Sequence, residues 1–428
     1  MAGKTYLAIM CGAGDRPGAN ADQATPLEAA TTPYLDGLAR AGTQSLITII
    51  NDEICPESDS GAMALLSYDP LLHYTGRGPL EGLGCDFAAA GENSVSFRIN
   101  FASYNGEKQQ LDRRTSRDLS NDELQILVRE LREETVLRDD SDISFDLMGF
   151  GRHRGIICFR STGRPLSGRV SNTDPGFINV GPFGVPDANP EPRPKMCAPL
   201  VDDSAAARTA DLVNRFVAES AKVLQRSSVN RRRIAEGKLP ANILLFRDGG
   251  DQPAAMQPFM DRFDRSLSFY GQIPAEKGLM SLIGGRFSYC RLGEGEDEGK
   301  YLEETAAKLL RDDADVVAVH LKGADEPGHD GLIEKKTQAI ELIDRHFIRS
   351  LVNGLDSTDV CIITSDHATP CELRIHSADP VPALVCGRDI ASDYTATFCE
   401  REALRGGLPV RRAVELLPHV FNRKMDRA

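Results

Sequence analysis

Carboxylates and imidazoles are concentrated in one short part of this sequence. Residues 325–330 read Asp-Glu-Pro-Gly-His-Asp, residues 365–367 read Ser-Asp-His, and His376 follows nine residues after His367. Oxygen and imidazole ligands at this density are typical of sites for zinc or manganese. A single His or Asp after a strand is more often a turn residue or a helix N-cap, so it is the joint occurrence that favours a catalytic metal site.

The elements that would position these residues are two short apolar runs. Residues 315–321 (Asp-Val-Val-Ala-Val-His-Leu) precede the first segment, and residues 359–364 (Asp-Val-Cys-Ile-Ile-Thr) precede the second. Such runs are typical of buried parallel strands. The carboxyl ends of parallel strands meet at one edge of a sheet, where a bound ion can act on a phosphate. We therefore predict an α/β fold with a mostly parallel central sheet and the ligands at one edge of it.

Length and composition restrict the class of protein. The chain has 428 residues, of which 41% are hydrophobic, and a net charge of −13. This length favours two domains, the negative charge argues against nucleic acid as a partner, and no apolar run is long enough to span a bilayer. The ten cysteines are scattered, and residues 1–11 read as a first strand and not as a signal peptide. We expect a cytoplasmic enzyme with no membrane partner; homo-oligomerisation stays open.

The middle of the chain has a different character. Between residues 77 and 252, arginine-containing strand-like pieces alternate with helical segments, one of which begins near Asn121. A Pro-rich loop is expected over residues 172–199 and one long helix over residues 204–235. We therefore predict an inserted α+β domain that caps the site, covering residues 77–252.

The core domain is expected to be discontinuous. It comprises residues 1–76 and 253–428 and holds the predicted metal ligands. After a strand at residues 242–247, the pattern returns to strand and helix at residues 266–283, with Lys277 near the start of the helix.

Ser58 is a candidate nucleophile. It follows a strand predicted over residues 45–50 and precedes an apolar helical run from Ala62. At a helix N-terminus, exposed backbone N–H groups stabilise a phosphoryl group or an ionised hydroxyl. Serine is also among the commonest helix N-caps, so the residues by themselves leave both roles open.

Further motifs extend over nearly the whole chain. They are Gly-Asp-Arg-Pro at 14–17, Pro-Glu-Ser-Asp at 56–59, Gly-Arg-Gly-Pro at 76–79, Arg-Ile-Asn-Phe at 98–101, Asp-Arg-Arg at 112–114, Gly-His-Asp-Gly at 328–331 and Asp-His-Ala-Thr-Pro-Cys at 366–371. In sequence and order they resemble the archaeal-type, 2,3-bisphosphoglycerate-independent phosphoglycerate mutases. This resemblance implies an alkaline-phosphatase-like core with an inserted phosphotransferase domain, and interconversion of 3-phosphoglycerate and 2-phosphoglycerate through a phosphoserine.

The resemblance also implies roles for individual residues. Ser58 falls on the phosphorylated serine; Asp325, His329 and His376 fall on the ligands of one divalent ion, manganese or zinc. Asp366 and His367, with Ser58, fall on the ligands of a second ion. Basic groups around the phosphate and carboxylate of a small phosphorylated acid are implied at Arg113, Arg114, Arg117, His153, Arg154, Arg247 and Lys277.

Three residues near the expected nucleophile depart from the family pattern. Cys11 stands where the family has an aspartate that binds the serine-side ion, Glu57 replaces a glycine, and Ala62 replaces an asparagine or histidine. A thiolate at position 11 could bind a softer ion such as zinc; alternatively, that ion binds weakly or not at all.

These departures leave three hypotheses for function. The first is phosphoglycerate interconversion, and the second is a diverged relative acting on another phosphate- or phosphonate-bearing small molecule as a phosphatase or mutase. The third is a non-catalytic binding protein with a decayed site. The joint presence of the five histidine and aspartate ligands argues against the third, because charged groups that are costly to bury should be lost first.

Overall fold

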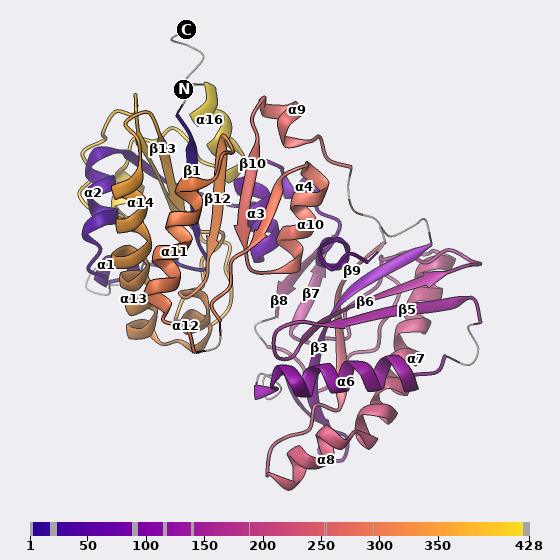
Figure 1. Cartoon of the computed structure of the whole chain (residues 1–428). Helices are drawn as coiled ribbons and strands as arrows, with labels where there is room; N and C mark the ends of the chain where they lie inside the picture. The colour runs from indigo at the N-terminus through magenta and orange to yellow at the C-terminus, as the bar shows by residue number, and fades with distance from the viewer. Residues whose placement is uncertain are drawn as a thin grey trace. The chain divides into compact units, whose positions relative to one another are not determined.

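The computed structural model describes residues 3–17, 24–87, 93–113, 118–137, 141–187, 189–251, 253, 255–293 and 295–422. The chain divides into two compact units (Figure 1): unit 1 comprises Met1–His73 with Ala255–Ala428, and unit 2 comprises Tyr74–Ala254. Among the helices of the described ranges, none is both long and apolar enough to cross a membrane.

Unit 1 alternates strands and helices. Its elements are β1 (Thr5–Met10), α1 (Pro26–Ala29), α2 (Pro33–Ala41), β2 (Thr43–Ile47), α3 (Ser58–Leu65), α4 (Pro70–His73), α9 (Phe259–Phe263), β10 (Leu267–Gly271), α10 (Pro274–Ile283), β11 (Arg286–Tyr289), α11 (Glu298–Arg311), β12 (Val316–Leu321), α12 (Asp325–Asp330), α13 (Ile333–Leu342), the π-helix η2 (Ile343–Ile348), α14 (Arg349–Gly354), β13 (Val360–Thr364), β14 (Val381–Gly387), α15 (Glu400–Arg405), the 3-10 helix η3 (Ala413–Glu415) and α16 (Leu416–Asn422).

The sheet of unit 1 is mostly parallel, which confirms the prediction. Its strands pair in the order β11-β10-β12-β1-β13-β14-β2, and β14 runs antiparallel to its neighbours while the other pairs are parallel. β1 lies between β12 and β13, with Met10 beside Leu321 and Ile9 beside Thr364. The residues that follow these three strands therefore emerge together at one edge of the sheet.

The central strand β1 is buried on both faces, which explains its continuous apolar sequence. Tyr6, Ala8 and Met10 belong to a core cluster with apolar residues of α2, α11 and α13, and Figure 1 shows α11, α13 and α14 along the same face of the sheet. The loop after β1 is fixed by the buried Lys336, whose Nζ lies 2.9 Å from Asp15 Oδ2 and donates to the carbonyls of Gly14 and Thr369.

Unit 2 has its own antiparallel sheet. β3 (Ser94–Asn105) pairs with β4 (Gln110–Asp112), β6 (Arg154–Ser161) and β9 (Ile243–Gly250), and β5 (Ile143–Gly149) pairs with β6. The remaining elements are α5 (Arg77–Gly84), α6 (Asn121–Glu134), β7 (Phe177–Val180), β8 (Phe183–Pro186), α7 (Ser204–Arg226) and α8 (Ser228–Ala235). A separate core cluster includes Phe97, Phe159, Phe216 and Phe246. The predicted α+β character of this part of the chain is therefore present.

Two local expectations in unit 2 were wrong. The long helix expected over residues 204–235 is two helices, because Ser227 leaves the helical backbone and its side chain caps α8 by accepting from Val229 N. The loop expected over residues 172–199 contains the β7–β8 hairpin.

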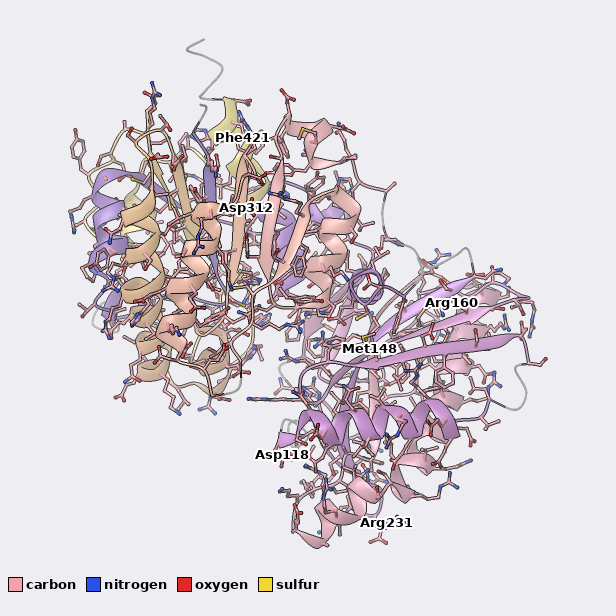
Figure 2. The ribbon with its side chains drawn as sticks, in the orientation of Figure 1. Asp118, Met148, Arg160, Arg231, Asp312 and Phe421 are labelled. Atoms are coloured by element: carbon pink, nitrogen blue, oxygen red, sulfur yellow. The ribbon has the colours of Figure 1, made fainter. Side chains whose placement is uncertain are left out.

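An ion-pair cluster joins α8 to the start of α6. The buried Arg233 of α8 binds Asp118, labelled in Figure 2, and Glu123 of α6.

Candidate metal centre and nucleophile

Asp325, His329 and His376 form a cluster of metal-type ligands at the sheet edge. α12 places Asp325 and His329 four residues apart on one helical face, and the loop after β13 supplies His376. The Nε2 atoms of the two histidines are 3.2 Å apart and lie 3.5 and 3.4 Å from Asp325 Oδ1. Ligand atoms held at about 2.0–2.1 Å in a tetrahedral shell lie roughly 3.3 Å from one another. The spacing therefore fits a divalent ion.

Outer contacts orient both imidazoles for this role. His329 Nδ1 lies 3.0 Å from the Arg374 carbonyl, and His376 Nδ1 lies 3.0 Å from the Pro56 carbonyl. A carbonyl accepts only from an N–H, so the proton of each neutral ring is on Nδ1 and the lone pair on Nε2 faces Asp325. In the absence of an ion, burial opposes ionisation of Asp325, but the hydrogen bond and charge of His376 in its protonated form, with His367 and His329, hold the pKa of the Asp325 carboxyl well below its usual range.

Cys11, Asp366 and His367 form a second cluster beside the first. Cys11 Sγ lies 3.5 Å from Asp366 Oδ2 and 3.8 Å from His367 Nε2, and those two atoms are 3.3 Å apart. Thr369 connects the clusters, because its hydroxyl lies 3.1 Å from His367 Nδ1 and donates to Asp325 Oδ1 at 2.7 Å. Cys11 directly follows β1, and Asp366 and His367 follow β13.

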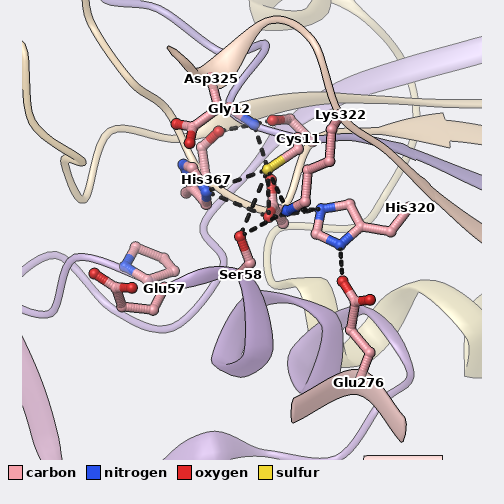
Figure 3. A network of polar contacts seen from close by, with 12 residues as sticks. Cys11, Gly12, Glu57, Ser58, Glu276, His320, Lys322, Asp325 and His367 are labelled. Atoms are coloured by element: carbon pink, nitrogen blue, oxygen red, sulfur yellow. Dashed lines mark hydrogen bonds and ion pairs between the residues drawn. The ribbon is translucent and has the colours of Figure 1, made fainter. Parts of the chain in front are cut away.

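Ser58 lies at this second cluster (Figure 3). Its Oγ is 3.5 Å from Cys11 Sγ, and the residue is 8% exposed as the first residue of α3. The backbone N–H of Glu57 donates to Ser60 Oγ and closes the first turn of the helix. α3 can approach the β13 loop because residue 61 is glycine: a Cβ there would lie 2.4 Å from the carbonyl oxygen of Asp366.

Two of the residues that we expect to depart from the family pattern, Glu57 and Ala62, change which groups face the site. Glu57 Oε1 lies 3.7 Å from His376 Nδ1, so it places a carboxylate beside the first cluster. Ala62 is buried in α3 and offers no polar group. Gly12, which follows Cys11, adopts φ +61° and donates its N–H to Asp366 Oδ1 at 3.0 Å.

Three ionisable residues at the site were missed by the sequence reasoning: Glu276, His320 and Lys322. His320 Nδ1 contacts Glu276 Oε1, and its Nε2 lies 2.9 Å from Asp366 Oδ2. Lys322 Nζ lies 2.9 Å from Cys11 Sγ and 3.1 Å from Ser58 Oγ (Figure 3). A sequence signal existed, because His320 and Lys322 are two residues apart at the end of a strand and so share one face of the sheet.

Charges in this cluster are mutually compensating. Burial opposes ionisation of Asp366, but His367 and His320 hold the pKa of its carboxyl below the ordinary value. Burial and Lys322 oppose protonation of His320, yet Asp366, Cys11 and Glu276 raise its pKa well above the usual one. Burial and the charge of Asp366 raise the pKa of the Cys11 thiol. A thiol, a carboxylate and an imidazole suit a soft ion such as zinc, which must displace the thiol proton.

The predicted substrate-binding residues are divided between the two units. Lys277 lies on α10 of unit 1. In unit 2, Arg247 and Arg113 lie over the ring of Phe177, with guanidinium carbons 3.9 and 5.3 Å from its centre. Arg113 also forms a two-pronged bond with Asp174. Arg114 and Arg117 lie outside the described residues.

His153 and Arg154 lie where β6 begins, and Arg154 pairs in register with Asn100 of β3. Arg98, in the motif at residues 98–101, was assigned no role from the sequence; it is buried, contacts Glu81 and pairs in register with Arg247. Burial, together with the charges of Arg77, Arg247 and Arg154, lowers the pKa of Arg98 to about 9 despite Glu81. Arg98, Arg154 and Arg247 therefore gather around the middle of β3.

Comparison with known proteins matches both parts of the chain. The family described as 2,3-bisphosphoglycerate-independent phosphoglycerate mutase matches residues 39–230, and the metalloenzyme superfamily matches residues 288–412. A 2,3-bisphosphoglycerate-independent phosphoglycerate mutase of Aeropyrum pernix is 34% identical over 412 residues, which are 95% of this chain and 95% of the relative.

Solved structures agree with the fold. A protein of Pyrococcus horikoshii aligns with a TM-score of 0.77 at 28% identity, covering 100% of this chain and 98% of the other. A cofactor-independent phosphoglycerate mutase of Thermoplasma acidophilum aligns with a TM-score of 0.56 at 26% identity, covering 97% and 98%. These structures confirm the α/β fold class with a mostly parallel central sheet, and the extent of the sequence match shows that this chain belongs to the 2,3-bisphosphoglycerate-independent phosphoglycerate mutase family.

Proposed function

We propose that this chain interconverts 3-phosphoglycerate and 2-phosphoglycerate by passing the phosphoryl group through Ser58. The observation that carries the proposal is the position of Ser58 Oγ, at the first turn of α3 and 3.5 Å from Cys11 in one of two adjoining clusters of metal-type ligands. A phosphoryl group on this oxygen would face the N–H groups of the first turn of the helix.

The reaction balances without a further reactant. Ser58 Oγ bonds to phosphorus while the bond from phosphorus to the glycerate oxygen breaks, and the serine proton ends on that oxygen. After the bound glycerate reorients, its other hydroxyl takes the phosphoryl group and Ser58 recovers a proton. The chain must therefore hold glycerate and exclude water between the two steps, since water at the phosphoserine would release phosphate.

In this proposal Asp325, His329 and His376 hold a divalent ion, manganese or zinc, while Cys11, Asp366 and His367 favour zinc because the thiol is a soft ligand. When bound, such ions supply positive charge for the phosphoryl oxygens and the nucleophile. The phosphate and carboxylate of the substrate are assigned to Arg113, Arg114, Arg117, His153, Arg154, Arg247 and Lys277. Within the described residues no cysteine is in a disulfide, which suits the proposed cytoplasmic location.

Cys11 supports one alternative function. A thiol in place of a carboxylate removes a hard ligand beside the nucleophile, and this change is consistent with a relative that acts on another phosphate- or phosphonate-bearing small molecule. Cys11 is buried at 0% exposure and its Sγ lies 3.5 Å from Ser58 Oγ, so a change of residue type at this position would act directly on the proposed nucleophile.

The test is a coupled assay for conversion of 3-phosphoglycerate to 2-phosphoglycerate, on metal-stripped protein refilled separately with manganese and zinc. We expect conversion in the parent and in Ser281→Ala, an exposed serine of α10, and a loss of at least about 10³-fold in Ser58→Ala, because the covalent route is removed. A parent that leaves phosphoglycerate unchanged but hydrolyses p-nitrophenyl phosphate would favour the alternative function.

A further inference from the structure

Lys322 is placed against the proposed nucleophile. It directly follows β12, as Cys11 follows β1, and the pairing of Met10 with Leu321 makes these two residues neighbours at the sheet edge. Its Nζ donates to Ser58 Oγ at 3.1 Å and to Cys11 Sγ at 2.9 Å, and it lies 3.5 Å from His320 Nε2. None of these three partner atoms belongs to a carboxylate.

The surroundings keep this ammonium in place. His320 is held between Glu276 of α10 and Asp366 of the β13 loop, so its ring cannot turn away from Lys322 without losing two carboxylate contacts. A lysine side chain ordinarily carries its positive charge at neutral pH. The ammonium of Lys322 is therefore confined between Cys11 Sγ and Ser58 Oγ on one side and the ring of His320 on the other.

A fixed positive charge gains little from a neutral serine hydroxyl. It gains much more when that oxygen carries negative charge, as it does during attack on phosphorus and again when the phosphoserine is cleaved. We propose that Lys322 is a catalytic residue that stabilises the negative charge developing on Ser58 Oγ. This role rests on the proposed phosphoryl transfer through Ser58.

The experiment compares Lys322→Ala with the parent and with two matched controls, in metal-loaded full-length protein. One control is Lys322→Met, which fills the space of the side chain without its charge, and the other is Lys335→Ala, an exposed lysine of α13. The donors are 3-phosphoglycerate and p-nitrophenyl phosphate, so that a chain that does not isomerise phosphoglycerate still reports on Ser58 through release of nitrophenolate.

We expect kcat to fall roughly 10²- to 10³-fold in Lys322→Ala and in Lys322→Met, with KM changed much less, and Lys335→Ala to match the parent. Added n-propylammonium, which can reoccupy the space left by the lysine, should restore at least a tenth of the lost rate in Lys322→Ala and none in Lys322→Met. Tetramethylammonium, which has no N–H, should restore nothing. A kcat for Lys322→Ala within threefold of the parent would overturn the proposal, as would a loss that n-propylammonium leaves unchanged.

Discussion

At the scale of single residues, the orientation of each imidazole determines what it can do. His329 and His376 use Nδ1 for backbone carbonyls and His367 uses Nδ1 for the Thr369 hydroxyl, so all three direct Nε2 toward carboxylate or thiol ligands. His320 differs, because both of its nitrogens face carboxylates. It is therefore a charged, hydrogen-bonded support and not a metal ligand.

A residue outside the site gives a prediction about pH. Glu400 is buried, accepts from Asp15 N at 2.9 Å and Thr25 Oγ1 at 2.7 Å, and burial raises its pKa from 4.5 to about 7. Between these two values the folded state binds more protons than the unfolded state, so the free energy of unfolding falls as pH rises through the window. The loss is roughly 3 kcal/mol for a shift of this size.

Glu400→Gln removes this titration. Urea unfolding at pH 5 and pH 8 should therefore show the variant gaining about 3 kcal/mol relative to the parent across that interval. Glu304→Gln, an exposed glutamate of α11, should follow the parent at both values. Parallel pH dependence in the parent and Glu400→Gln would show that the carboxyl is already ionised at pH 5.

At the scale of elements, α3 must lie close to the β13 loop for Ser58 to reach Cys11. In Gly61→Ala the added Cβ would lie 2.4 Å from Asp366 O and 2.9 Å from Asp366 Cβ, so the helix and the loop must separate. We expect activity to fall at least about tenfold and the free energy of unfolding to fall by about 1–3 kcal/mol, as for other overpacked sites.

Gly37→Ala in α2 is the matched control. A Cβ at that position has no heavy atom within 4 Å, so alanine should stabilise the helix by about 0.5–1 kcal/mol and leave activity unchanged. Activity assays and urea unfolding on both variants separate the two effects. Full activity in Gly61→Ala would mean that α3 has room to move without displacing Ser58.

The elements show why some features were predictable and others were not. β12 and β13 were predicted because strands buried on both faces need continuous apolar sequence, and their ends place Asp325, Asp366 and His367 at one edge. The break between α7 and α8 at Ser227 was not predicted. The Ser227 side chain accepts from Val229 N only when the backbone of Ser227 has already left the helical conformation. His320 and Lys322 were missed because they lie at the end of an apolar run and acquire partners only through tertiary contacts.

At the scale of the whole molecule, the chain has the family fold, and the three residues that we expect to depart from the family pattern lie at one end of the candidate site. The relative from Aeropyrum pernix matches 95% of the chain, and the metal-type ligands cluster as expected, yet Cys11, Glu57 and Ala62 all lie in or beside the α3 end of the site. The family could be read from motif order, but the charge around Cys11 depends on Lys322, which only the folded sheet places beside it.

The most direct test of the account is to locate the phosphoryl group during turnover. Metal-loaded full-length protein is mixed with 2-phosphoglycerate, quenched within the first turnover and digested, and the peptide that contains Ser58 is examined by mass spectrometry. The account predicts one added phosphoryl group on Ser58, formed and lost at rates fast enough to sustain interconversion. Interconversion that continues while Ser58 stays unmodified throughout the time course would contradict it.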